Sequence, residues 1–334
     1  MPLDKVKSII NELKQGNPKP IYFLMGEEPY YIDGISKYIE ENLLTEEEKG
    51  FNQMVLYGRD VSVEDIISNA KRYPMMAERQ VVIVKEAQDL SRTIENLVPY
   101  ALNPQPTTVL VFCYKYKTLD KRKKLAKEIA KSGVIFESKK LYDNQVPDWI
   151  KRVLAGKGYT ITPKAAQMLV EFLGNDLSKV NNELEKLQLL LKPGGQITPQ
   201  LIEENIGISK DFNNFELQNA IGTRDMKKAF AIIQYFSQNP KNNPLVVTVG
   251  MLYGFFAKLL KYHALTNKSE APKVLGVHPY FIKDYQTAAR NFPMKNVSAA
   301  IAVIRDVDMK SKGVGAANLS QEDLLKEMIV GILK

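Results

Sequence analysis

The stretch Ile21-Tyr-Phe-Leu-Met-Gly-Glu-Glu-Pro-Tyr-Tyr31 joins a short apolar run to a helical pattern through a glycine, two carboxylates and a proline. Its first five residues have the length and character of a buried strand. Apolar residues then recur at helical spacing at Ile32, Ile35, Ile39 and Leu43. A buried strand followed directly by an amphipathic helix is the repeating unit of a parallel sheet with crossover helices, so this stretch predicts an α/β fold.

Four more short apolar runs follow before residue 140, and they are rich in β-branched residues. They lie at Gln53–Tyr57, Val81–Val84, Thr108–Phe112 and Val134–Phe136. Helical patterns fill the gaps between them, which favours parallel strands buried on both faces. Residues 1–140 are therefore predicted to form one doubly wound α/β domain.

Beyond residue 140 the patterns have helical spacing. Thr162-Pro163 and Thr198-Pro199 each place a capping hydroxyl before a proline that suits the first helical turn. We predict a small helical domain at 141–210 and an all-α domain of five or six helices at 211–334. The helical patterns of this last domain cover Phe215–Ile221, Ala229–Phe236, Leu245–Leu265, Tyr280–Phe292, Val297–Met309 and Leu324–Leu333.

The composition excludes several classes of protein. Lys and Arg outnumber Asp and Glu by 46 to 38, and the formal net charge of +8 favours acidic partners without reaching the density of a nucleic-acid coat. The one cysteine, Cys113, lies in an apolar run and is expected to be buried. Because no run approaches the roughly 18 apolar residues of a membrane span and no signal core opens the chain, we expect a cytoplasmic protein without membrane contact.

The position after the first strand is where an α/β domain would carry a phosphate-binding loop. Such a loop uses glycines, a lysine and a hydroxyl residue, whose N–H groups and ammonium hold the phosphates. Here Gly26 is followed by Glu27, Glu28 and Pro29, and the next lysine is Lys37. Two carboxylates repel a triphosphate and proline donates no N–H, so we expect this loop not to bind ATP.

Other ingredients of catalysis are missing from the sequence. The strand at Val81–Val84 is followed by Lys85 and Glu86, where a nucleotide hydrolase would place two acidic residues. Two histidines, His263 and His278, and a single cysteine are too few for a metal cluster or a nucleophilic triad. We therefore predict no catalytic residue, no metal and no cofactor.

Apolar residues also gather at a corner before the third strand. A helical pattern at 63–70 ends before Tyr73-Pro-Met-Met76, where the proline disfavours continuation of the helix. Exposed methionines are typical of adaptable binding surfaces, so Tyr73, Met75 and Met76 are a candidate binding site. The alternative is that Met75 and Met76 pack beneath the sheet.

A second candidate surface is basic. The segment 115–131 carries eight basic side chains against two acidic ones. Lys121, Arg122 and Lys124 are candidates for contact with nucleic-acid phosphates. The alternative is an ordinary solvated helix face.

Six motifs occur in order along the whole chain. They are Gly26-Glu-Glu-Pro-Tyr-Tyr31, Tyr73-Pro-Met-Met-Ala-Glu-Arg-Gln80, Phe172-Leu-Gly-Asn-Asp176, Asn182-Glu-Leu-Glu-Lys186, Phe215-Glu-Leu-Gln-Asn-Ala-Ile221 and Asp308-Met-Lys310. Together they resemble the delta subunit of bacterial DNA polymerase III clamp loaders. The resemblance implies an AAA+-like α/β domain with a parallel sheet and a degenerate P-loop at 1–140, a small helical lid at 141–210 and an all-α collar at 211–334.

The resemblance also implies a function and partners. A hydrophobic wedge at Tyr73, Met75 and Met76 would bind the sliding clamp, the beta subunit, and open its ring for loading onto primed DNA during chromosomal replication. The collar would join the gamma or tau and delta prime subunits, and neighbouring subunits would hydrolyse ATP. This chain would hydrolyse none, and would share in DNA polymerase activity only as a member of the holoenzyme. Two methionines stand here in place of the family's commoner leucine or phenylalanine pair.

Two other functions stay open from the residues alone. A nucleotide hydrolase with an unusual loop predicts saturable ATP binding. A DNA-binding module that acts through the segment 115–131 predicts salt-sensitive affinity for primed DNA.

Overall fold

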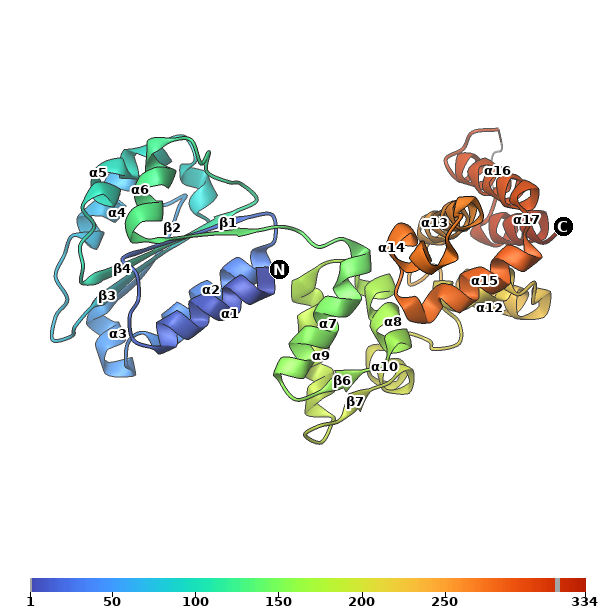
Figure 1. The fold of residues 1–334 in the computed structure, drawn as a ribbon, viewed down its shortest axis with the longest axis horizontal. Coiled ribbons are helices and arrows are strands. Elements are labelled where there is room, and N and C mark those ends of the chain that lie inside the picture. Colours follow the sequence, from blue (N-terminus) through green and yellow to red (C-terminus); the bar gives the residue numbers. More distant parts are fainter. Residues whose placement is uncertain (1, 316–318) are drawn as a thin grey trace. The chain divides into compact units, whose positions relative to one another are not determined.

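The computed structural model describes residues 2–315 and 319–334, and the chain divides after Leu141 into two compact units. The first unit contains one five-stranded sheet with helices on both faces (Figure 1). All five strands are parallel and lie in the order β2-β3-β4-β1-β5, which confirms the predicted parallel α/β fold. Their bounds are β1 (Ile21–Gly26), β2 (Gln53–Tyr57), β3 (Gln80–Lys85), β4 (Thr108–Lys115) and β5 (Val134–Ser138).

Helices cover the sheet because each connection between parallel strands must cross one of its faces. The helices α1 and α2 pack on one face, and α4, α5 and α6 cover the other (Figure 1). The bounds in this unit are α1 (Pro2–Lys14), α2 (Pro29–Asn42), α3 (Glu46–Asn52), α4 (Val63–Ala70), η1 (Ala87–Leu90), η2 (Ile94–Leu97), α5 (Val98–Leu102) and α6 (Lys124–Ser132).

The core of the first unit lies between the sheet and these helices. Phe23 on β1 and Phe112 on β4 are fully buried and stack with ring centroids 5.3 Å apart. Cys113 is buried as predicted, and its burial raises the pKa of the thiol to about 11. A thiol that holds its proton so firmly is a packing residue rather than a nucleophile.

The second unit is helical apart from one short parallel pair, β6 (Thr160–Ile161) and β7 (Gln196–Ile197). The sequence prediction of helices alone beyond residue 140 is wrong here, because two-residue strands are too short to show an alternating pattern. The pair leads into two helices whose caps were predicted: Thr162 and Thr198 each accept a hydrogen bond from the third helical N–H. The first helices of this unit are η3 (Asp143–Gln145), α7 (Val146–Gly156), α8 (Pro163–Leu173), α9 (Leu177–Leu189) and α10 (Pro199–Ile206).

The rest of the second unit is an all-helical bundle around one apolar core. It has seven α-helices in the described residues rather than five or six, because the short helix α14 at Ala271–Leu275 lies between the helical patterns predicted at Leu245–Leu265 and Tyr280–Phe292. The bounds are α11 (Asn214–Gly222), α12 (Met226–Gln238), α13 (Leu245–Ala264), η4 (Lys268–Glu270), α14 (Ala271–Leu275), η5 (Pro279–Phe281), α15 (Ile282–Asn291), α16 (Met294–Ser311) and α17 (Gln321–Leu333).

The longest helix, α13, has the length and apolar composition that a membrane span would need. Core helices of globular units have the same two properties. Leu252, Phe256 and Leu259 of α13 are buried in the bundle core. This packing accounts for the apolar composition of the helix.

A shielded carboxyl group lies where α8 meets α11. Oε2 of Glu171 accepts a hydrogen bond from the backbone N–H of Phe215 at 3.2 Å. Burial, with a smaller contribution from the nearby charge of Glu216, raises the pKa of Glu171 to about 8. Glu216 is itself ion-paired with Lys164 at 2.6 Å and with Lys228. Glu171 is therefore protonated at neutral pH in the folded chain.

We expect the substitution Glu171→Gln to flatten the pH dependence of stability. A folded pKa of about 8 against the ordinary glutamate value of 4.5 means that protonation favours the folded state. This stability is fully present below about pH 4.5 and is lost as the pH rises to about 8. Calorimetric Tm values of the variant should rise relative to the natural chain between about pH 5 and pH 8. A Tm difference that stays constant over this range would contradict the assignment.

Candidate functional site

The loop 71–79, between α4 and β3, carries apolar side chains into solvent. Tyr73, Met75 and Met76 are 77%, 58% and 102% exposed, respectively. The alternative that the two methionines pack beneath the sheet is therefore wrong. Three large apolar groups that lie so close together in solvent are unusual unless a partner covers them.

The base of this loop is fixed by one buried amide. Nε2 of Gln80, the first residue of β3, lies 3.2 Å from the carbonyl oxygen of Asn69, 3.3 Å from that of Ala70 and 2.5 Å from that of Arg72. Asn69 and Ala70 are the last residues of α4, where carbonyl groups lack regular i to i+4 partners, and Arg72 lies in the loop just beyond it. Thr108 on the next strand supports the same corner through an Oγ1 contact of 2.8 Å to Nε2 of Gln80. The chain must therefore leave the helix at this point and cross to β3.

The apex of the loop is held by α3. Oδ1 of Asn52 accepts from the backbone N–H of Met75 at 2.6 Å, and Nδ2 of Asn52 donates to the carbonyl oxygen of Met75 at 2.9 Å. Phe51, the preceding residue, is exposed. Neither Phe51 nor Asn52 was predicted from the sequence, where the one signal is an aromatic side chain at the end of a charged helical segment.

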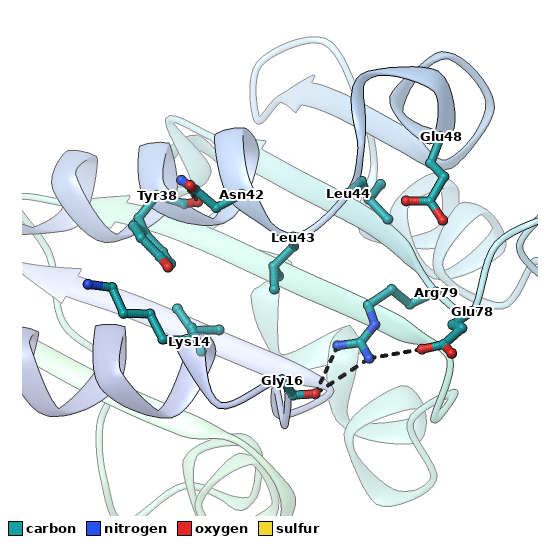
Figure 2. Close-up of a pocket in the computed structure, with 10 residues that line it drawn as sticks. Lys14, Gly16, Tyr38, Asn42, Leu43, Leu44, Glu48, Glu78 and Arg79 are labelled. Atoms are coloured by element: carbon teal, nitrogen blue, oxygen red, sulfur yellow. Dashed lines mark hydrogen bonds and ion pairs between the residues drawn. The ribbon is translucent and has the colours of Figure 1, made fainter.

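A groove of about 430 Å³ lies beside the end of the loop. Figure 2 shows Arg79 reaching across it toward the turn after α1, with Lys14 and Glu48 on other parts of the wall. The guanidinium of Arg79 donates to the carbonyl oxygen of Gly16 at 3.4 Å and lies 3.6 Å from Glu78 (Figure 2). Charges of both signs line this groove, so it does not select an anionic or a cationic ligand.

The position of a phosphate loop is occupied by the chain itself. Gly26 has a φ of 123°, and a Cβ there would lie 2.0 Å from the carbonyl oxygen of Ser138. The carboxylate of Glu28 caps α2 by accepting from the N–H of Tyr30 at 3.2 Å. Helix N-termini bind phosphate through free N–H groups and the positive end of the helix dipole. Here a carboxylate already occupies that end, and Pro29 contributes no N–H.

Lysines also neutralise the carboxylates near the ends of β3 and β4. Lys115 lies 2.9 Å from Asp33 and 3.0 Å from Glu86, and Lys85 lies 3.0 Å from Glu40. Burial opposes the charge on Lys115, but the hydrogen bonds that its ammonium group donates to Asp33 and Glu86 raise its pKa. Within residues 2–315 and 319–334, no group of three or more His, Cys, Asp or Glu side chains is placed to hold a metal ion. The lysines and carboxylates near these strand ends are therefore paired with one another.

The basic segment is divided between a loop and a helix. Lys121 and Arg122 precede α6, and Lys124 is its first residue, so the candidate cations do not share one helix face. Lys121 pairs with Glu137 at 2.6 Å and Arg122 pairs with Asp120 at 2.8 Å. Lys124 is exposed and has no ion pair within the described ranges. Two of the three side chains that were predicted to contact phosphates are therefore already paired with carboxylates.

The structure defines a two-unit protein, in which a parallel α/β unit whose loop after β1 is capped by its own carboxylate is followed by a largely helical unit. The family model described as DNA polymerase III, delta subunit, matches residues 22–139, and that for the C-terminal domain of the same subunit matches residues 211–328. The chain belongs to the DNA polymerase III delta subunit family, whose members are clamp-loader subunits.

Relatives from two bacteria match most of the chain. DNA polymerase III subunit delta of Bacillus subtilis is 26% identical over 342 residues, which cover 98% of this chain and 97% of that protein. A probable DNA polymerase III subunit delta of Aquifex aeolicus is 22% identical and covers 87% of this chain and 86% of its own length. The solved structure of the Bacillus subtilis DNA clamp loader delta protein matches 98% of this chain and 99% of its own, at 25% identity and a TM-score of 0.56.

Proposed function

We propose that this chain binds the sliding clamp, the beta subunit of DNA polymerase III, and opens its ring for loading onto primed DNA. The wedge consists of Tyr73, Met75 and Met76. The observation that carries the proposal is the exposure of these three side chains on a loop that is hydrogen-bonded at its base and its apex. Burial of a large apolar side chain contributes about 1.5–3 kcal/mol. Two or three such groups supply enough free energy to hold a strained protein ring.

The double substitution Met75→Ala/Met76→Ala should weaken clamp binding by at least about 30-fold, because most of the apolar area of the wedge is lost. The thermal stability should stay within about 1 °C, because both side chains already face solvent. Surface plasmon resonance with the purified clamp measures the first quantity and calorimetry the second.

Leu102→Ala is the matched control, since Leu102 is an exposed apolar residue of the same unit that lies outside the loop. Its affinity for the clamp should equal that of the natural chain. If the double variant bound the clamp as tightly as the natural chain, the assignment of the wedge would be contradicted.

The helical unit is proposed to supply a lid at 142–210 and a collar at 211–334 that joins the gamma or tau and delta prime subunits. Support comes from α13, whose apolar side chains Val246, Val247 and Tyr253 are exposed to solvent. Gly250 and Gly254 of the same helix have open space where a Cβ would lie. A neighbouring helix could approach such a face closely. As a replication subunit, the chain is proposed to act in the cytoplasm.

We expect the isolated chain not to bind ATP, so that hydrolysis falls to neighbouring subunits of the loader. The carboxylate of Glu28 at the start of α2 repels a triphosphate, and Pro29 offers no N–H group to hold one. Isothermal titration with magnesium and ATP should give no saturable heat. Saturable binding would restore the hydrolase hypothesis.

The basic segment is a second candidate contact, with primed DNA, and it is compatible with clamp opening. Lys124 is exposed and unpaired in the described ranges, whereas Lys121 and Arg122 already face carboxylates. The variant Lys121→Glu/Arg122→Glu/Lys124→Glu should lose its salt-sensitive affinity for primed DNA, and Lys124→Glu alone should account for most of that loss. Fluorescence anisotropy at several salt concentrations tests this. A salt slope that does not change would leave the segment as a solvated surface.

A further inference from the structure

We propose that Asn52 is the positioning residue that holds the wedge in its exposed conformation. The inference rests on the proposed clamp binding and adds a residue from a separate helix to it. Asn52 is 4% exposed, and its side-chain amide makes both of its loop contacts with the backbone of one residue, Met75. The side-chain amide of Asn52 thus hydrogen-bonds to the N–H and C=O groups of Met75, as the backbone of a neighbouring strand would.

Asn52 can act in this way because its own position is fixed. Its Nδ2 also donates to the carbonyl oxygen of Glu48, one turn earlier in α3, at 3.2 Å. A capping box between Thr45 and Glu48 closes the start of this short helix. The residue after Asn52 begins β2, which pairs with β3 in the sheet. The amide is therefore anchored both to a capped helix and to the sheet.

The backbone of Met76 shows what this anchor does. Met76 has a φ of 54°, in the left-handed region that residues with a Cβ rarely adopt. Such a conformation costs free energy and persists only where its surroundings impose it. Since Asn52 binds both polar backbone groups of Met75, the chain turns immediately afterwards and the side chain of Met76 lies wholly in solvent. A wedge held in this form loses less conformational entropy when it binds.

The test is clamp binding by the full chain with Asn52→Ala, in which all three wedge side chains remain. We expect affinity to fall about tenfold, through the added cost of ordering the loop. Amide hydrogen exchange across residues 71–79 should become faster while exchange in the strands stays unchanged. A loss caused by general unfolding would change both.

Two further variants make the test specific. Asn52→Asp keeps an acceptor for the N–H of Met75 but places a carboxylate against the carbonyl group of Met75, so its affinity should lie between those of Asn52→Ala and the natural chain. Asn42→Ala is the matched control, because Nδ2 of Asn42 also donates to a carbonyl one turn earlier, that of Tyr38, at 2.9 Å. Among the described residues, its side chain makes no hydrogen bond to the loop 71–79. This control should bind as the natural chain does.

A coupling measurement separates positioning from direct contact. In a Met76→Ala background, the effect of Asn52→Ala should shrink, because less apolar surface remains to be positioned. Natural affinity and natural exchange in Asn52→Ala would overturn the role of Asn52 while leaving the wedge intact. Natural affinity in Met75→Ala/Met76→Ala would instead remove the proposed function itself.

Discussion

The corner that carries the wedge depends on the buried amide of Gln80. Gln80 is the first residue of β3. Its Nε2 atom lies close to backbone carbonyl oxygens at the end of α4 and just beyond it. The fold of the sheet sets this position, because β3 lies between β2 and β4 and must start beside Thr108. The residues between α4 and β3 consequently belong to no helix or strand. Its apolar side chains lie in solvent as a result of this constraint.

In the same unit, the carboxyl ends of the strands are surrounded by contacts within the chain. Parallel α/β domains bind ligands at the carboxyl ends of their strands, where helix N-termini point at the ligand. In this chain Glu28 caps the helix that follows β1, and Lys115 neutralises Glu86 beyond β3. Gly26 and Ser138 are partners in the parallel pair of β1 and β5, and a Cβ on Gly26 would lie 2.0 Å from the carbonyl oxygen of Ser138. The module therefore keeps the scaffold of a nucleotide-binding domain while its exposed apolar surface lies on the loop before β3.

Much of the fold could be predicted from the sequence, because its determinants are local. The five strands of the first unit are short apolar runs separated by helical patterns, and the four after the first are rich in β-branched residues, which favours a parallel arrangement. A helix that ends before a proline made Met75 and Met76 candidates for exposure, but only the resemblance to the delta subunit family favoured exposure over packing beneath the sheet. The two-residue strands β6 and β7 could not be predicted, because their pairing arises from tertiary contact alone.

The parts of the site that escaped prediction depend on contacts distant in sequence. Asn52 lies 23 residues before Met75, and no spacing rule links an amide at the end of one helix to a later loop. The ion pair of Lys121 with Glu137 likewise exists only because the loop before α6 lies beside β5. A count of charges over 115–131 therefore overstates the free positive charge of that segment. The role of a side chain could be predicted from the sequence where residues close to it in the chain determine that role.

The central claim is that the loop 71–79 is the surface that contacts the clamp, and photo-cross-linking tests it most directly. A benzophenone amino acid in place of Met76 should form a covalent product with the purified clamp on illumination. The same group in place of Leu102 should form none. Cross-linking from Leu102 but not from Met76, in a chain that still binds the clamp, would contradict this account.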